Sequence, residues 1–246
     1  MNEKTKYDLI LSIGQACSCT EVLRKACLQF YSYPFDWLYG SNFTERIKLL
    51  CNNMENFTNK ENLEYIQDIK STSRRLFRNK VTDISFNHDF EIYRPLDETY
   101  PEFEKKYKRR IERMYKQIDK SNKILFVYLQ TPNDSNELSE EELINGLNLL
   151  KNKLGGSRVS LLYLYSDSNR QYENRQVKFL NEDLTIVKFD YNAHDENIPY
   201  KVQYKALNKI FTKFKISNKF LTYKNKFVRL IYLIRILFRK EFWKAL

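Results

Sequence analysis

The chain has 246 residues, of which 42% are hydrophobic and 15% aromatic, with only five glycines and five prolines. This composition excludes a disordered or low-complexity protein and suffices for a substantial core in one or two domains. The formal net charge is +11, but residues 201–246 hold 13 Lys or Arg and a single acid, Glu241. The remaining 200 residues carry 29 basic and 30 acidic side chains, so a nearly neutral body precedes a cationic tail.

The N-terminus, "MNEKTKYDLIL", lacks the basic segment, long apolar run and small-residue cleavage site of a signal peptide. No stretch approaches the ~18 continuous apolar residues that span a bilayer. The four cysteines then read as reduced thiols, and we expect a cytoplasmic protein without disulfide bonds.

The first 80 residues begin with a short apolar run, Tyr7–Ile13, which predicts a buried strand ending at Gly14. "SCTEVLRKACLQF" follows with helical spacing, where Ser18 or Thr20 is the expected cap and Glu21 lies in the first turn. "FYSYPFDWLYGS" predicts an ordered loop. Residues 43–80 look helical and amphipathic throughout.

The next part of the chain alternates helices and strands. A strand is expected at Asp83–Phe90 and a helix over Tyr100–Ser121, with Phe103, Tyr107, Ile111, Met114 and Ile118 on its buried face. Then follow "KILFVYLQ" (strand), "SEEELINGLNLLKNKLGG" (helix), "RVSLLYLYS" (strand) and "LTIVKFDY" (strand). Continuous apolar strands between helices predict an α/β fold with a mainly parallel sheet that includes the first strand, in one domain of residues 1–200.

The tail, residues 201–246, ends in "NKFVRLIYLIRILFRKEFWKAL", which predicts a basic amphipathic helix. The residues expected at an anionic membrane surface are Arg229, Arg235, Arg239, Lys240 and Trp243. A terminal helix docked on the domain fits the same periodicity, and the sequence leaves both interpretations open. A nucleic-acid partner is not expected, because no binding motif is legible and the cations do not extend onto the body.

Cys17 would lie at the first turn of a helix that follows a strand. Main-chain N–H groups and the helix dipole at this position favour a thiolate, and they also stabilise an oxyanion on an attacked carbonyl. A thiol nucleophile needs a base, and the chain offers His88 and His194. The cysteines lack the paired spacing of a zinc site and Gly14 stands outside any phosphate-binding motif, so we expect neither a metal nor a cofactor.

Three motifs carry a family resemblance over roughly residues 7–200. "GQACS" with Leu23–Arg24 and "SYPFDW", then "NHDF" at Asn87–Phe90, then "KRRIERM" before a strand, resemble a bacterial family labelled putative papain-like cysteine peptidases. A late Gly-Asn-Asp element is matched only loosely by "YNAHDEN", where Asp195 is the nearest counterpart.

The resemblance implies a cysteine-type hydrolase or acyl-transfer site with Cys17 as nucleophile and His88 as general base, and with Asp89 or Asp195 orienting the imidazole. Its implied substrate-binding residues are Ser18, Asp36, Trp37, Arg110 and Arg113. The two arginines would bind an anionic group of the substrate. For Asp36 the alternative is a structural role in the loop beside the cysteine. The family is also often associated with bacterial surface polysaccharides. The expected substrate is therefore an acyl or glycan compound bearing an ester, thioester or amide. The rivals are an acyltransferase acting on a glycan and a non-catalytic glycan- or phosphate-binding accessory protein, and the oligomeric state is left open.

Overall fold

The computed structural model describes residues 5–130 and 137–167 continuously. Beyond these it describes 176–181, 183–190, 194–195, 198–202, 207, 210–217, 227, 230–231 and 233–234. The account below concerns these residues.

A five-stranded sheet forms the centre of the molecule, in the order β2-β7-β8-β10-β9. Its strands are β2 (Leu9–Ser12), β7 (Ile124–Gln130), β8 (Val159–Asp167), β10 (Leu184–Asp190) and β9 (Gln176–Asn181). All neighbours pair in parallel except β9, which runs antiparallel to β10. The predicted α/β fold with a mainly parallel sheet is confirmed, and the N-terminal strand joins that sheet as expected.

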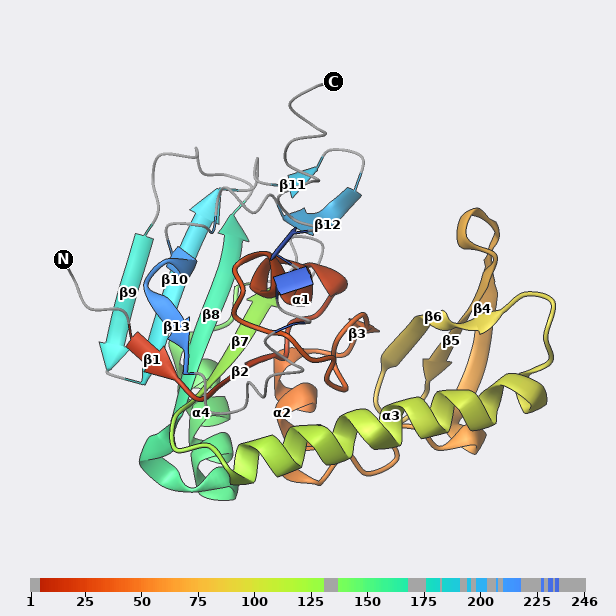
Figure 1. The fold of residues 1–246 in the computed structure, drawn as a ribbon, viewed down its shortest axis with the longest axis horizontal. Helices are drawn as coiled ribbons and strands as arrows, with labels where there is room; N and C mark the ends of the chain where they lie inside the picture. Colours follow the sequence, from red (N-terminus) through yellow and green to blue (C-terminus); the bar gives the residue numbers. More distant parts are fainter. Residues whose placement is uncertain are drawn as a thin grey trace.

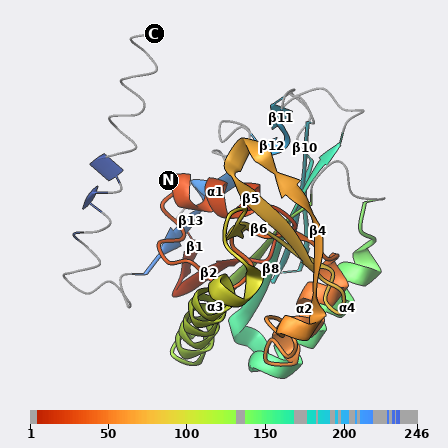
Figure 2. The same cartoon turned by 90° about the vertical axis from the view of Figure 1, so that its right-hand side faces the viewer.

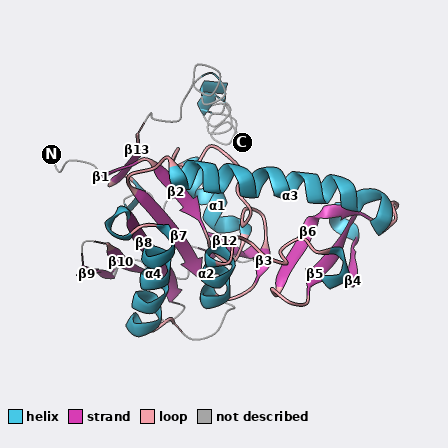
Figure 3. Cartoon of the chain, turned by 90° about the horizontal axis from the view of Figure 1, so that it is seen from below, coloured by secondary structure: helices cyan, strands magenta, loops and turns pink. Residues whose placement is uncertain are grey.

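The two faces of this sheet contact different helices, because side chains alternate along each strand. In β7, Ile124, Phe126 and Tyr128 pack in one hydrophobic cluster, whereas Leu125 and Leu129 pack in the other. The first cluster includes α2 (Phe43–Cys51), α3 (Leu96–Asp119) and α4 (Glu140–Leu154), and α2 lies beside α4 (Figure 3). The second includes α1 (Cys17–Lys25) and the side chains of Leu207, Ile210 and Phe211. The parallel sheet is therefore covered on both faces, as its continuous apolar strands predict.

A second, antiparallel sheet corrects the prediction for residues 43–80. Its order is β3-β6-β5-β4, formed by β3 (Tyr39–Gly40), β6 (Ile84–Glu91), β5 (Arg74–Asn79) and β4 (Leu63–Ile69). Only Phe43–Cys51 of the predicted helical stretch is an α-helix. The short 3-10 turns Lys60–Asn62 and Lys70–Thr72 flank β4. The strand expected at Asp83–Phe90 is present as β6.

Helix α3 joins the two sheets. It runs from the antiparallel sheet to the edge of the parallel one (Figure 1), and the antiparallel sheet stands in front of the parallel one when the molecule is turned (Figure 2). The residues of α3 that face the core are Phe103, Tyr107, Met114 and Ile118, while Ile111 is partly buried, so the predicted stripe is correct. The cluster Phe86, Phe103 and Tyr107 fixes α3 against β6, with ring centroids 4.9–5.4 Å apart.

The C-terminal part extends the body beyond residue 200. Strand β13 (Phe214–Ile216) pairs in parallel with β1 (Thr5–Tyr7), and Leu207, Ile210 and Phe211 are buried in the second cluster. The short strands β11 (His194–Asp195) and β12 (Ile198–Val202) pair antiparallel. These contacts indicate that the folded body extends to about Ser217, and that the tail begins after this residue rather than after residue 200. No C-terminal helix is shown, and the proposed membrane-facing residues of the tail lie outside the described part of the chain.

Candidate active site

Cys17 is the first residue of α1 and follows the end of β2, at the carboxyl edge of the parallel sheet. The loop between them passes close to its neighbours at Gly14. A Cβ there would lie 2.5 Å from the Cβ of Cys19 and 3.1 Å from the main-chain nitrogen of Leu129. Only glycine therefore lets this loop present Cys17 without displacing the core.

The predicted cap of α1 is wrong. Ala16 occupies the N-cap and provides no side-chain hydrogen bond, and the first turn holds no acidic residue. Thr20 instead donates to Asp36 at 2.8 Å, and Ser18 is buried with no hydrogen-bond partner for its Oγ among the described residues. The N-cap thus supplies no side-chain cap to the first-turn N–H groups, which are suited to stabilise negative charge near Cys17.

The structure brings His88 to Cys17 across 71 positions of sequence. The Cys17 Sγ and the His88 Nε2 are 3.7 Å apart. His88 lies on β6 of the antiparallel sheet, whereas Cys17 lies on helix α1, which follows β2 of the parallel sheet. The side chain of the other candidate base, His194, lies outside the described residues.

The environment keeps the thiol of Cys17 protonated at neutral pH. Burial raises the pKa of Cys17 to about 11, its own main-chain N–H opposes this, Glu21 raises it further and Arg46 lowers it. The expected lowering by the helix terminus is thus outweighed by desolvation.

The pKa of His88 is shifted in the opposite direction. Burial lowers it below the ordinary 6.5, and the nearby cations Lys106 and Arg74 add to this shift. A thiol with a raised pKa beside an imidazole with a lowered one makes a neutral pair. In such a pair the imidazole is free to take the thiol proton during attack.

Asp89, the first candidate for orienting the imidazole, makes its contacts with α3. Its carboxylate forms an ion pair with Lys106 and accepts a hydrogen bond from the Tyr107 hydroxyl at 3.2 Å. Successive residues of a strand point to opposite faces, which separates this carboxylate from the His88 ring. Asp195, the second candidate, lies on β11, whose partner β12 contacts α1, but its side chain is not described.

Asp36 has a structural place behind the site. Its carboxylate is fully buried and accepts hydrogen bonds from Gln29 Nε2 at 2.7 Å, Thr20 Oγ1 at 2.8 Å and the Tyr33 main-chain N–H at 2.9 Å. Burial raises the pKa of Asp36, against the effect of these hydrogen bonds and of Arg24. This corrects the assignment of Asp36 to substrate binding and supports the alternative, a carboxylate that ties α1 to the following loop.

Arg24 completes this tie and explains why Leu-Arg accompanies "SYPFDW" in the sequence. Its Nη2 donates to Ser32 Oγ at 2.8 Å and lies 3.7 Å from the Asp36 carboxylate. Its guanidinium also stacks over Trp37, 5.4 Å from the centre of the ring. Trp37 has a positive φ of 67°, a conformation that bulky residues rarely adopt. The loop beside Cys17 is thus held in a costly shape by contacts from α1.

The two predicted anion-binding arginines differ in their contacts. Arg113 donates to the Ser32 carbonyl at 3.2 Å and stacks over Tyr31 at 5.3 Å. Arg110 stacks over Tyr107 at 5.1 Å, and its Nη1 is buried without a hydrogen-bond partner among the described residues. Tyr107 in turn lies close enough to Cys17 for the thiolate to raise its pKa. Arg110 is therefore the better placed of the two for a substrate anion.

Sequence reasoning missed Arg46 on α2, which is fully buried. Its guanidinium donates to four main-chain carbonyls, those of Gly14, Gln15, Gly40 and Ser41. One signal could have found it: Arg46 lies three residues after Phe43 and four before Leu50, on the apolar face of its helix. A cation at such a position must find internal acceptors.

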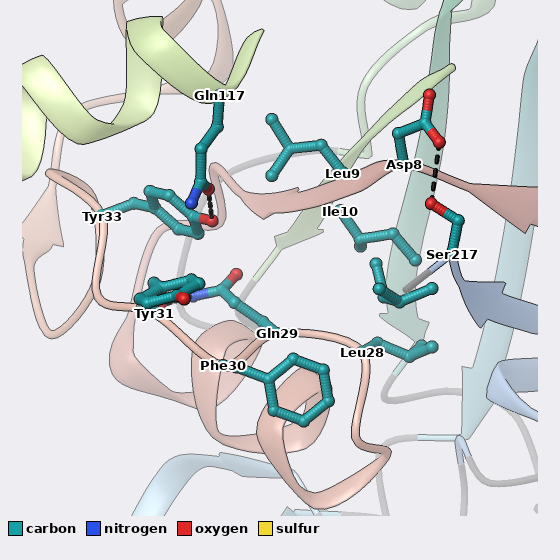
Figure 4. Close-up of a pocket in the computed structure, with 11 residues that line it drawn as sticks. Asp8, Leu9, Ile10, Leu28, Gln29, Phe30, Tyr31, Tyr33, Gln117 and Ser217 are labelled. Atoms are coloured by element: carbon teal, nitrogen blue, oxygen red, sulfur yellow. Dashed lines mark hydrogen bonds between the residues drawn. The ribbon is translucent and has the colours of Figure 1, made fainter. Parts of the chain in front are cut away.

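A small cavity of about 30 Å³ is lined by neither Cys17 nor His88 (Figure 4). It is lined by the segment Leu28–Tyr31, by Tyr33, and by Asp8, which is hydrogen-bonded to Ser217 at 2.7 Å. Its volume suits a single water molecule, so it is no substrate pocket. The hydroxyl of Tyr33 is hydrogen-bonded to Gln117 on α3 across it.

Two negative findings apply to the described part of the chain. Within it, no cluster of three or more His, Cys, Asp or Glu side chains is arranged to hold a metal ion. No described helix has the length and apolar character to cross a membrane.

Comparison with known proteins places this chain in a family. The chain is 27% identical over 183 residues to the uncharacterized protein R408 of Acanthamoeba polyphaga mimivirus, covering 67% of this chain and 80% of the viral one. No solved structure gives a significant match. The model of the family described as "Putative papain-like cysteine peptidase (DUF1796)" matches residues 8–163, a range that contains both Cys17 and His88. The chain therefore belongs to this putative papain-like cysteine peptidase family.

Proposed function

We propose that this protein is a cysteine-dependent acyl-cleaving enzyme in which Cys17 attacks an ester, thioester or amide carbonyl with His88 as general base. The observation that carries the proposal is the 3.7 Å separation of the Cys17 Sγ and the His88 Nε2. The family description supports the same chemistry.

The reaction begins from the neutral pair. As the sulfur bonds to the carbonyl carbon, the thiol proton passes to His88 Nε2 and the carbonyl π electrons move onto oxygen. Main-chain N–H groups at the start of α1 stabilise that oxyanion. When the tetrahedral intermediate collapses, the bond to the leaving group breaks and His88 returns the proton to it. Water then releases the acid in a hydrolase, or an acceptor hydroxyl takes the acyl group in a transferase.

Arg110 is the proposed contact for an anionic group of the substrate, with Arg113 beside it. Support comes from the unpartnered Nη1 of Arg110 and from the cations Lys106 and Arg74 that act on His88. Further candidates are Ser18, which follows the nucleophile in sequence, and Trp37, whose ring stacks with Arg24 of α1. A glycan-linked acyl substrate of surface-polysaccharide metabolism fits this proposal, and Asp195 remains the candidate that orients His88.

The test is turnover of a panel of p-nitrophenyl esters, aryl thioesters and anilides by the full chain. Cys17→Ala and His88→Gln should abolish or strongly reduce cleavage, whereas the matched thiol variant Cys51→Ala, which removes a half-buried cysteine on α2, should not. Full activity of Cys17→Ala on every substrate that the wild type cleaves would falsify the proposal. His194→Gln tests the other histidine in the same assay.

The second candidate is a non-catalytic binding protein for an anionic glycan or a phosphate. The raised pKa of Cys17 and the cations around His88 favour it. Titration calorimetry with a phosphorylated sugar separates the candidates, because a binding protein retains affinity in Cys17→Ala but loses it in Arg110→Gln. No turnover by the wild type together with that pattern would support binding.

For the tail we propose contact with an anionic membrane, which would place the enzyme at the inner face of the plasma membrane. Four described apolar residues support it, because their side chains are exposed: Phe227, Leu230, Ile231 and Ile234. The cationic partners would be Arg229, Arg235, Arg239 and Lys240, with Trp243 at the interface. Removal of residues 220–246 should abolish sedimentation with vesicles rich in phosphatidylserine; a truncated body that binds equally well would contradict it.

A further inference from the structure

The two halves of the proposed Cys17–His88 pair are carried by separate segments. Cys17 follows the loop Ile13–Ala16 at the end of β2, whereas His88 lies on β6. One of the two neighbours of β6 is β3, in which Tyr39 pairs with Ser85 and Gly40 with Ile84. A separation of 3.7 Å between Sγ and Nε2 therefore depends on what joins the first loop to β3.

Arg46 makes that junction with hydrogen bonds to both sides. On the side of the nucleophile, its Nη1 donates to the Gly14 carbonyl at 2.6 Å and its Nη2 to the Gln15 carbonyl at 3.4 Å. On the side of β3, its Nη2 donates to the Gly40 carbonyl at 2.6 Å and its Nε to the Ser41 carbonyl at 3.4 Å. A planar guanidinium holds these acceptors in one plane, which an ammonium on a flexible stem does not do.

The surroundings prevent Arg46 from moving away. The side chain is fully buried, and its guanidinium lies 5.2 Å from the ring centre of Phe35, within the "PFDW" loop. Gly40 has a φ of 78°, and a Cβ there would lie 2.4 Å from the Asp83 carbonyl oxygen, so β3 itself has one fixed position against β6. The link from the loop of Cys17 to the strand of His88 is therefore short and rigid.

Arg46 also contributes a positive charge near the thiol. Among the described residues, the charged or titratable groups that act on or contact Cys17 are Glu21 on α1, Asp36 in the loop, Arg46 on α2, His88 on β6 and Tyr107 on α3. Of these, Arg46 lowers the pKa of Cys17, and Glu21 and Asp36 raise it. The same guanidinium thus holds the loop of the nucleophile and partly offsets the rise in the pKa of Cys17 that burial causes.

We propose that Arg46 is the positioning residue of this enzyme: it clamps the loop of Cys17 to the strand pair β3–β6 and so sets the contact between Cys17 and His88. The inference rests on the proposed function only in taking that contact as the reactive one.

The experiment is a double-mutant cycle on the rate of Cys17 alkylation by iodoacetamide, followed by peptide mass spectrometry in the full chain. The four proteins are wild type, His88→Gln, Arg46→Lys and the double variant. In the wild-type background His88→Gln should slow alkylation about tenfold or more, since base assistance of this kind is worth about 10²–10⁴ in catalysis. In the Arg46→Lys background, His88→Gln should leave the alkylation rate almost unchanged, because the imidazole no longer reaches the thiol.

Controls separate positioning from loss of stability. Leu50→Ala removes a fully buried side chain from the same helix and should leave the His88 effect intact. If Arg46→Lys does not fold, Phe35→Leu removes the ring beneath the guanidinium and should reduce the His88 effect partially. Arg46→Gln, which removes the charge, should also move the pH midpoint of alkylation upward.

The outcomes are distinct. An undiminished His88 effect in folded Arg46→Lys, or in Phe35→Leu if only that variant folds, overturns the role of Arg46 and leaves the proposed function standing. Absence of a His88 effect in the wild type overturns the proposed pair itself. Loss of the effect in Arg46→Lys but not in Leu50→Ala supports the inference.

Discussion

Replacing Asp36 by alanine should destabilise the protein strongly, although this carboxylate does not touch the proposed nucleophile. Asp36 accepts hydrogen bonds from Thr20, Gln29 and the Tyr33 main-chain N–H, at 2.7–2.9 Å, and faces Arg24 at 3.7 Å. Each buried donor that loses its acceptor costs about 1–3 kcal/mol, and removal of one partner of a buried ion pair costs about 3–5 kcal/mol. We therefore expect a loss of about 3–5 kcal/mol in the free energy of unfolding.

The assay is urea unfolding followed by tryptophan fluorescence, supported by thermal melts. For a chain of this size each kcal/mol lowers the melting temperature by about 2–4 °C, so a fall of roughly 10 °C is expected. Asp97→Ala is the matched control, since that carboxylate is 81% exposed and pairs with Lys60 at the surface. It should cost less than about 1 kcal/mol. If Asp36→Ala costs no more than Asp97→Ala, the reasoning that α1 and the "PFDW" loop are tied through this carboxylate is refuted.

Three further predictions concern the site. In His88→Gln, which lacks the proposed base, Cys17 with a pKa of about 11 should alkylate faster with each pH unit up to about that value, and a plateau near neutral pH would show that the pKa of the thiol is not raised. Lys106→Met should raise the pKa of His88, because it removes a cation that lowers this pKa. NMR titration of His88 measures the shift, and the exposed variant Lys105→Met is the control that should leave the pKa of His88 unchanged. Gly14→Ala should cost about 1–3 kcal/mol by overpacking against Cys19 and should slow Cys17 alkylation; an unchanged melting temperature and rate would contradict it.

The parallel half of the fold could be predicted from the sequence, because its strands are continuous apolar runs bounded by helices and glycines. The antiparallel half was not. In β4, Leu63, Ile66 and Ile69 recur every three residues, which imitates a helix, and most of this edge strand is exposed, so no alternation marks it. What makes it a strand is its pairing with β5, for example the Tyr65 and Phe77 rings 5.8 Å apart.

The sequence predicts the two central residues of the candidate site but not the contacts that surround them. Local context and family motifs identified Cys17 and His88, and the structure brings them together. The roles of Asp36 and Asp89 depend on partners distant in sequence, Gln29 and Tyr33 for one and Lys106 and Tyr107 for the other. The raised pKa of Cys17 follows from burial, which depends on the whole fold and outweighs the helix terminus that the sequence suggests.

The most direct test of the central claim is detection of an acyl-enzyme. The full chain is mixed with an aryl thioester, quenched in acid and analysed by intact and peptide mass spectrometry. The account predicts one acyl group, on Cys17, formed at neutral pH and slowed about tenfold or more in His88→Gln. Acylation distributed over Cys17 and Cys51 alike, or independent of His88, would contradict it.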